Sequence, residues 1–251
     1  MNKQNLLTGG MKHLDLFSGI GGFALAASWC GFETVGFCEI NPWARRVLAK
    51  NFPNVPIHDD IKTFKGDTHG PVDILTGGFP CQPYSISGKK FGAKDERDCL
   101  PDMLRVVKES GARWVVAENS NRFLDVAFHE VKTFLEDEGY EVGEPLVIPA
   151  CSVNADHRRN RAWICAHRNT VGLQGGRQEA VQRFARLQEQ PARVFESGRS
   201  RRSISRPGML RSYNGIPNGV DRIKGLGNAV VPHVPYRIMR GIIEAEAMEV
   251  A

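Results

Sequence analysis

One cysteine of the sequence lies where a regular helix or inner strand cannot continue. Cys81 follows the string Gly-Gly-Phe-Pro at 77–80 and comes shortly before a second proline, Pro83. Proline lacks a backbone N–H and restricts the residue before it, so prolines on both sides disfavour regular structure here. We therefore expect the Cys81 thiol to be presented on a loop. With a lowered pKa, this thiol would be a nucleophile at neutral pH.

A glycine loop followed by a carboxylate is the second pattern that suits chemistry. Residues 19–22 read Gly-Ile-Gly-Gly after an apolar run, and Glu39 ends the next apolar run, 20 residues after Gly19. Glycines allow a sharp turn and a close approach to a ligand, and a carboxylate at this place accepts hydrogen bonds from ribose hydroxyls. The pair predicts a site for an adenosine-containing cofactor. It also fits a nicotinamide oxidoreductase, which would leave Cys81 unexplained.

These residues require a scaffold that brings strand ends together. Apolar runs alternate with helix-period stretches over residues 1–167, which is typical of a parallel sheet covered by helices. We expect strands over 12–17, 34–39, 72–76, 114–118, 140–148 and 161–166, and helices over 23–30, 42–51, 100–107, 131–135 and 235–248. Ligands bind at the carboxyl ends of the strands in such a sheet, so the residues just after each strand are the candidates for a site.

The composition is that of a globular protein. Hydrophobic residues make up 41% and charged residues 24%, and no apolar run approaches the roughly 18 residues of a membrane helix. The six cysteines form no Cys-x-x-Cys pair, and the first residues lack the pattern of a secretory signal. We therefore expect a cytoplasmic protein with reduced thiols, no membrane partner and no metal site. The five cysteines other than Cys81 are expected to pack as small hydrophobic residues.

The positive charge is concentrated in one segment. Residues 1–167 contain 19 Lys+Arg and 21 Asp+Glu, residues 168–224 contain 12 and 4, and residues 225–251 contain 2 and 3. The three balances add up to the net charge of +5. A basic, arginine-rich segment predicts a polyanionic partner such as nucleic acid. The same composition also suits a disordered insert.

Five short strings together resemble the ordered motif set of one enzyme family. They read Asp-Leu-Phe-Ser-Gly-Ile-Gly-Gly-Phe at 15–23, Gly-Gly-Phe-Pro-Cys-Gln-Pro-Tyr-Ser-Ile-Ser-Gly at 77–88, Glu-Asn-Ser at 118–120, Arg-Asn-Arg at 159–161 and Gly-Asn-Ala-Val-Val-Pro at 227–232. In order and spacing they resemble the DNA cytosine-5 methyltransferases of the compact bacterial or phage type. The resemblance implies an α/β fold with a Rossmann-like, S-adenosylmethionine-dependent methyltransferase sheet and helices on both faces.

The same resemblance divides the chain into three parts. Residues 1–167 would form the catalytic and cofactor-binding domain. Residues 168–224 would form a short basic target-recognition region, and residues 225–251 would return to the catalytic domain.

A covalent mechanism follows from the resemblance. The Cys81 thiolate would add to C6 of a cytosine flipped out of the duplex, and C5 would then take the methyl group of S-adenosylmethionine. Glu118 would act as the acid at N3 of the base. Arg161 would bind the base at O2, with Arg159 in support. These four residues are the expected catalytic set.

The remaining site residues also come from the resemblance. The expected cofactor contacts are Phe17, Gly19, Ile20, Gly21, Gly22, Glu39, Ile40, Asp60, Ile61, Pro80, Leu100, Asn228 and Ala229. The expected DNA contacts are Ser85, Ser87, Lys89 and Lys90 on a catalytic loop, and Arg199, Arg201 and Arg202 in the basic segment.

We therefore expect a monomeric enzyme that methylates C5 of cytosine in double-stranded DNA. It would act alone or as the methylase of a restriction-modification system beside a cognate restriction endonuclease. An RNA cytosine-5 methyltransferase of the same fold and a catalytically silent DNA-binding relative are the alternatives.

Overall fold

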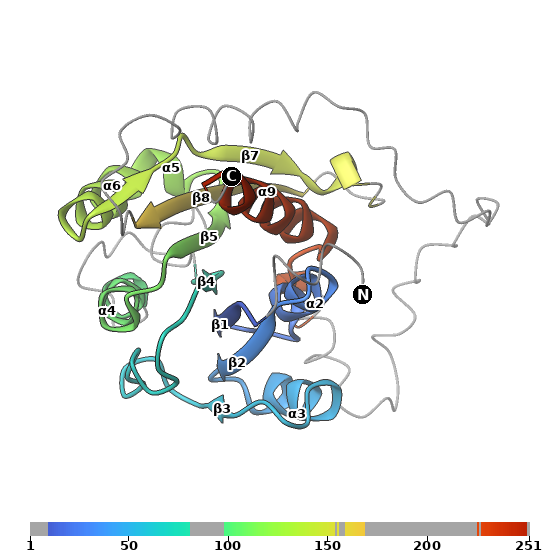
Figure 1. Cartoon of the computed structure of the whole chain (residues 1–251). Helices are drawn as coiled ribbons and strands as arrows, with labels where there is room; N and C mark the ends of the chain where they lie inside the picture. Colours follow the sequence, from blue (N-terminus) through green and yellow to red (C-terminus); the bar gives the residue numbers. More distant parts are fainter. Residues whose placement is uncertain are drawn as a thin grey trace.

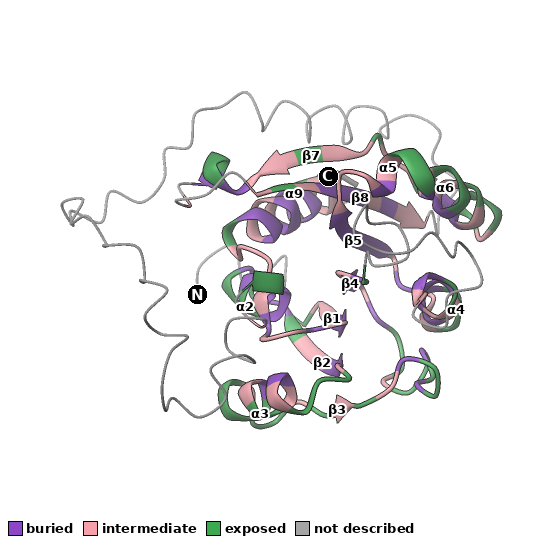
Figure 2. Cartoon of the chain, turned by 180° about the vertical axis from the view of Figure 1, so that it is seen from behind, coloured by how far each residue is buried: buried purple, intermediate pink, exposed green. Residues whose placement is uncertain are grey.

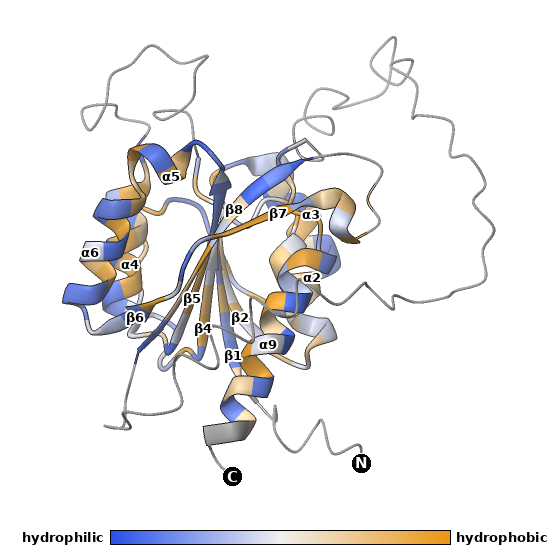
Figure 3. Ribbon diagram, turned by 90° about the horizontal axis from the view of Figure 1, so that it is seen from above, coloured by the Kyte–Doolittle hydropathy of each residue, from blue (hydrophilic) through white to orange (hydrophobic). Residues whose placement is uncertain are grey.

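The computed structural model describes residues 10–80, 98–153, 155, 159–168, 225 and 227–249 of the 251-residue chain. A central sheet lies between two layers of helices (Figure 1). Helices α2 (Gly22–Trp29), α3 (Pro42–Asn51) and α9 (His233–Glu249) lie on one side, and α4 (Leu100–Ser110), α5 (Phe123–Val126) and α6 (Phe128–Asp137) on the other, as the view along the sheet shows (Figure 3). The expected α/β sheet with helices on both faces is confirmed.

The strand order of the sheet is β3-β2-β1-β4-β5-β8-β6, and β7 also pairs with β8. The strands are β1 (Lys12–Leu16), β2 (Glu33–Cys38), β3 (Ile57–His58), β4 (Ile74–Gly77), β5 (Trp114–Ser120), β6 (Tyr140–Val142), β7 (Leu146–Pro149) and β8 (Asn160–Arg168). The first five run parallel, as the sequence predicts for β1, β2, β4 and β5, whereas it predicts no strand at 57–58. Strand β8 runs antiparallel to β5, β6 and β7, because the link from β7 to β8 is too short for a crossover.

The strand predicted over 140–148 is two strands in the structure. Strands β6 and β7 pair with successive parts of the same edge of β8, from Tyr140 opposite Arg168 to Pro149 opposite Asn160. The break falls at residues 143–145, where Pro145 has no N–H to donate to a ladder. Gly143 N still donates to Cys165 O, at 3.0 Å. The pairing direction is therefore kept across the break.

Helix α3 begins where the sequence predicts, because its first residues satisfy the free N–H groups of a helix start. Asn41 Oδ1 accepts from Trp43 N at 2.9 Å and from Ala44 N at 3.1 Å. Pro42 occupies the first helical position, where a missing N–H costs nothing. This cap holds the helix start directly after Glu39 and Ile40.

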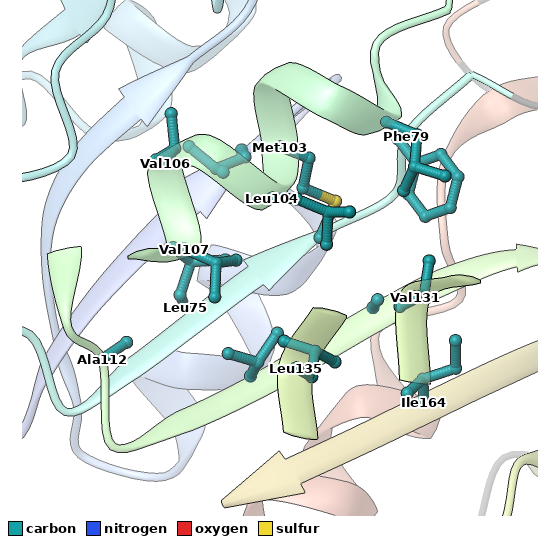
Figure 4. Packing of buried hydrophobic residues seen from close by; sticks show 14 of the residues in the cluster. Leu75, Phe79, Met103, Leu104, Val106, Val107, Ala112, Val131, Leu135 and Ile164 are labelled. Carbon is teal, nitrogen blue, oxygen red and sulfur yellow. The ribbon is translucent and has the colours of Figure 1, made fainter. Parts of the chain in front are cut away.

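Two hydrophobic cores fix the helices on the sheet. On one face, α4 and α6 pack on Leu75 and Ile164, with Met103 and Leu135 among the buried residues between them (Figure 4). On the other face, α2 and α9 pack on β4, β5 and β8 around Trp163. The buried residues of α2 and α9 lie on the side that faces the sheet (Figure 2). None of the helices in the described part of the chain is long and apolar enough to span a membrane.

Candidate active site

The carboxyl ends of the parallel strands and the amino end of β8 meet at one edge of the sheet. Ser120 at the end of β5 lies opposite Arg161 near the start of β8, and Glu118 lies opposite Trp163. Gly77 at the end of β4 pairs with Leu16 of β1 on one side and with Ala117 of β5 on the other. The glycine loop, Glu39, the residues before Cys81, Glu118 and the two arginines are thus brought to the same edge.

The glycine loop after β1 has an unusual backbone. Gly19 has φ 54° and Gly21 φ 87°, which glycine adopts without strain. Phe17, with φ 53°, is the only non-glycine residue with a positive φ in the described part of the chain. Such strain in a non-glycine residue is typical of ligand-binding sites. Gly21 also needs to be small, because a Cβ there would lie 2.7 Å from Phe52 Cε2.

The Glu39 carboxylate is already held in place by the backbone. Gly19 N donates to Oε2 at 2.7 Å, and Asn41 N donates to Oε1 at 2.8 Å. Carboxylate oxygens can accept further hydrogen bonds, so both remain able to take a ribose hydroxyl. The next residue, Ile40, is 72% exposed, so most of its apolar side chain is open to a ligand. The arrangement suits an adenosine moiety.

The other expected cofactor residues differ in exposure. Asp60 Oδ1 accepts from Lys62 N at 2.9 Å and so stabilises a turn after β3. Ile61 and Leu100 are buried in the core behind this edge, while Pro80 is exposed at the last described residue before Cys81. Of the C-terminal pair, Asn228 is exposed and Ala229 half-buried.

Glu118 lies at the centre of the catalytic half of the edge. Its side chain is buried, and Arg161 Nε lies 2.7 Å from Oε1, within ion-pair distance but outside good hydrogen-bond geometry. Burial raises the pKa of Glu118, and the nearby charges of Arg161 and Arg159 offset part of this effect. A carboxyl group in such surroundings can keep its proton closer to neutral pH than an exposed one.

The end of β5 also holds the start of the cysteine loop. Glu118 Oε2 lies against Gly78, where a Cβ would be only 3.2 Å away. Asn119 Nδ2 donates to Phe79 O at 3.2 Å. Asn119 is a residue to which sequence reasoning gave no role, although it stands in the Glu-Asn-Ser string. Together the two side chains fix the backbone that leads to Cys81.

A small hollow, partly open to solvent, lies beside Glu118. Its polar wall is formed by Glu118, Arg159 and Arg161, and its apolar wall by Ile148, Ala150, Trp163, Val230, Val231 and Val234. The Trp163 Nε1–H is buried and has no hydrogen-bond partner within the described residues. A carboxyl group, a guanidinium and apolar side chains therefore meet around this hollow.

The C-terminal segment reaches both halves of the edge. The Arg159 guanidinium donates to Gly227 O, and its Nη2 also donates to Asn228 O at 3.3 Å. A Cβ on Gly22 would lie 2.7 Å from Val230 Cγ2, so the segment packs directly on the glycine loop. Arg159 therefore holds the segment from the catalytic side while Val230 contacts the cofactor side.

A buried chain of hydrogen bonds runs beneath the glycine loop. Thr76 Oγ1 donates to Asp15 Oδ1 at 2.9 Å, so His13 Nε2 donates to Thr76 Oγ1 at 2.8 Å and His13 Nδ1 accepts from Thr34 Oγ1 at 3.0 Å. Burial lowers the pKa of His13 to about 3 and raises the pKa of Asp15 to about 8. Both groups are therefore mostly neutral at pH 7.

Eight expected site residues lie outside the described part of the chain. They are Cys81, Ser85, Ser87, Lys89, Lys90, Arg199, Arg201 and Arg202. Within the described residues, no group of three or more His, Cys, Asp or Glu side chains could hold a metal ion.

Solved structures with the same fold include two enzymes of the DNMT2 type. The Spodoptera frugiperda DNMT2 E260A/E261A/K263A mutant superposes with a TM-score of 0.55 and 24% identity, over 66% of this chain and 52% of that chain. S. pombe Dnmt2 methyltransferase gives a TM-score of 0.55 and 22% identity, over 69% and 54%. At these identities the likeness establishes the fold alone.

Curated relatives match at higher identity. Type II methyltransferase M.HhaI of Haemophilus parahaemolyticus is 35% identical over 180 residues, 68% of this chain and 53% of the relative. Type II methyltransferase M.NgoMIV of Neisseria gonorrhoeae is 33% identical over 162 residues, 62% and 51%. The chain spans about half the length of these relatives. The sequence profile described as C-5 cytosine-specific DNA methylase matches residues 11–204. With most of its length inside that match, the chain belongs to the C-5 cytosine-specific DNA methylase family.

Proposed function

We propose that this chain methylates C5 of cytosine in double-stranded DNA, with S-adenosylmethionine as the methyl donor. The main support is the placement of the Glu118–Arg161 pair. It lines the hollow next to the backbone leading to Cys81, at the same sheet edge as the glycine loop and Glu39. The proposed acid and the proposed cofactor loop thus lie at the same end of the parallel strands. The names of the type II methyltransferase relatives agree with this proposal.

The cofactor half of the edge fits an adenosylated donor. Glu39 would accept hydrogen bonds from the ribose hydroxyls, Ile40 would cover one face of the nucleoside, and Asp60 with Ile61 would bind the adenine. Phe17, Ile20, Gly21, Gly22, Pro80, Leu100, Asn228 and Ala229 would complete the pocket. S-adenosylmethionine supplies an electrophilic methyl group when it is bound there.

The catalytic half supplies a nucleophile and an acid. The Cys81 thiolate would form a bond to C6 of the cytosine, and the electrons of the C5=C6 double bond would move to C5, making it nucleophilic. Glu118, whose pKa is raised by burial, would share its proton with N3 as negative charge develops on the ring. Arg161 would hold O2 of the base. Once C5 carries the methyl group, loss of the C5 proton to solvent and departure of the thiolate from C6 would restore the aromatic ring.

DNA contacts would come from outside the described residues. We propose that Ser85, Ser87, Lys89 and Lys90 bind the backbone around the flipped nucleotide, and that Arg199, Arg201 and Arg202 contact phosphates. The proposed division remains 1–167, 168–224 and 225–251. The proposed setting is the cytoplasm, where the chain would act as a monomer beside DNA and a cognate restriction endonuclease.

Trapping on a modified base tests this function. Duplex DNA containing 5-fluorocytosine blocks the loss of the C5 substituent, so the wild-type chain should form a covalent adduct in the presence of S-adenosylmethionine. The C81A variant should form none. A parallel incubation with labelled methyl donor and either duplex DNA or tRNA identifies which nucleic acid is methylated. Label in tRNA alone, or no adduct with wild type, would contradict the proposal.

A further inference from the structure

Helix α4 contacts the turn after β3, which holds the residues proposed to bind adenine. Figure 1 places this turn beside α4, on the side of the sheet where α4 packs. Arg105 Nη2 donates to Ile61 O at 2.6 Å, and Arg105 Nη1 donates to Phe64 O at 3.0 Å. A single guanidinium therefore pairs two carbonyl groups of a segment that has no strand or helix to pair them.

Glu109, one helical turn further along α4, holds the other end of the same turn. Its Oε2 accepts from Gly66 N at 2.8 Å, and its Oε1 pairs with Arg105 Nη1 at 2.8 Å. The backbone itself is in close contact, because a Cβ on Gly66 would lie 2.5 Å from Val106 O. The turn from Asp60 to Gly66 is thus fastened to α4 at three of its backbone groups.

The opposite face of α4 is occupied by core packing. Met103, Leu104 and Val107 point into the cluster with Leu75 and Leu135 (Figure 4). The core holds the helix in place, so the helix can serve as a rigid support for the turn. The side chains of Arg105 and Glu109 are only partly exposed, at 34% and 33%, and both form hydrogen bonds with the backbone of the turn.

We propose that Arg105 and Glu109 are positioning residues that set the adenine selectivity of the cofactor site. They do so by holding the turn on which Asp60 and Ile61 stand, without contacting the cofactor themselves. The inference rests on the proposed function, in which Asp60 and Ile61 bind the adenine. A carboxylate at Asp60 would accept from the 6-amino group of adenine and repel the 6-oxo group of hypoxanthine.

The test compares two ligands that differ only at that position. S-adenosylhomocysteine and S-inosylhomocysteine are titrated calorimetrically into the full chain as wild type, R105M and R240M. Methionine keeps an unbranched apolar side chain like the stem of arginine but removes the guanidinium with its charge and donors. Arg240 is the matched control, since it also forms an (i, i+4) pair, with Glu244, and its side chain is also 34% exposed.

The expected results separate positioning from general stability. Wild type should bind S-adenosylhomocysteine more tightly than S-inosylhomocysteine. R105M should bind S-adenosylhomocysteine about tenfold more weakly than wild type does, while its affinity for S-inosylhomocysteine should change much less. R240M should keep both affinities within about twofold. If Arg105 had only a structural role, R105M would bind both ligands more weakly by the same factor. An unchanged ratio of the two affinities would therefore overturn the proposal.

Three further substitutions, at Gly66 and Glu109, act without removing Arg105. In G66A, the added methyl group would push the turn away from α4, so selectivity should fall as in R105M. In E109Q, the amide oxygen can accept from Gly66 N or from Arg105 Nη1 but not from both, so selectivity should be lost in part, whereas E109A should lose more of it. Unchanged selectivity in both G66A and E109A would refute the proposal. A wild-type chain that binds neither ligand would instead refute the proposed function and, with it, this inference.

Discussion

Glu39 and Glu118 are carboxyl groups at the same edge of one sheet, yet they are held in different ways. Glu39 is bound by backbone N–H groups of Gly19 and Asn41. Glu118 is buried and faces the side-chain charges of Arg161, on the antiparallel strand β8, and of Arg159, just before that strand. Because backbone N–H groups hold the Glu39 carboxylate, the proposed cofactor half of the site has its geometry before any ligand binds. The proposed catalytic half depends on long arginine side chains. One of them, Arg159, also donates to the carbonyl of Gly227, 68 residues further along the chain.

The comparison predicts that the two halves fail separately. E118Q should lower kcat by about 100-fold or more, because the amide cannot donate an acidic proton to the base. Affinity for S-adenosylhomocysteine should stay within about twofold of wild type. Single-turnover methylation and calorimetry check the two quantities, with the exposed E33Q as control. A parallel loss of cofactor affinity would show that the halves are not separate.

E39Q should give the reverse result. The amide N–H₂ of glutamine cannot accept from Gly19 N or Asn41 N, so one of the two backbone donors loses its partner. We expect S-adenosylhomocysteine to bind about tenfold more weakly, with kcat at saturating donor close to wild type. A fall in kcat that saturating donor does not restore would place Glu39 in the catalytic half.

R159M should affect both halves modestly, because Arg159 holds the carbonyls of Gly227 and Asn228 and its charge acts on Glu118. Affinity and kcat should each fall a few-fold. The Arg159 charge lowers the pKa of Glu118, so its removal should raise that pKa and move the alkaline limb of the kcat–pH profile to higher pH. An unmoved alkaline limb would leave Arg159 with only its role at the C-terminal segment.

The smallest expected effect concerns Asp15, which supports the cofactor half from below. Burial raises its pKa from the ordinary 3.8 to about 8, so the folded state keeps a proton that the unfolded state has lost. This stabilisation is complete below pH 4 and disappears as the pH rises to about 8. His13, whose pKa falls from 6.5 to about 3, has the opposite dependence below pH 6.5.

The two effects therefore cancel in part at acid pH and leave Asp15 alone between pH 6.5 and 8. The Asp15 contribution to stability should fall in this range by about 1 kcal/mol per pH unit, and D15N should lack this fall. Urea unfolding at three pH values measures both slopes, and the exposed D137N should follow wild type. Equal slopes for D15N and wild type would exclude Asp15 as their source.

The same contrast explains what the sequence could predict. Strands β1 and β2, the glycine loop and α3 were readable because their signals are local: apolar runs, glycines, and the Asn41 cap before Pro42. Strand β3 has two residues, too few for any periodicity. The break between β6 and β7 comes from one proline in a short run. The antiparallel direction of β8 depends on link length rather than on residue pattern.

At the site, those candidates from local strings that the structure describes lie at the same end of the strands, but their hydrogen-bond partners were not predictable. The contact of Arg159 with Gly227 joins residues far apart in the chain, and no spacing encodes it. The hydrogen bond of Asn119 to Phe79 O likewise depends on the pairing of β4 and β5. Local patterns indicate which residues do chemistry, whereas tertiary packing decides what holds them.

The packing of Val230 on Gly22 has a consequence for synthesis on the ribosome. Residues 10–80 leave the exit tunnel long before Val230 is made. The glycine loop therefore lacks its contact with Val230 while most of the chain is synthesised. Helix α9 arrives equally late, and its Glu246 pairs with Arg113, 133 residues earlier. Contacts of such long sequence separation slow folding. A nascent chain of this protein therefore completes the packing around its glycine loop only after residue 230 has been made, about 200 residues after the loop itself.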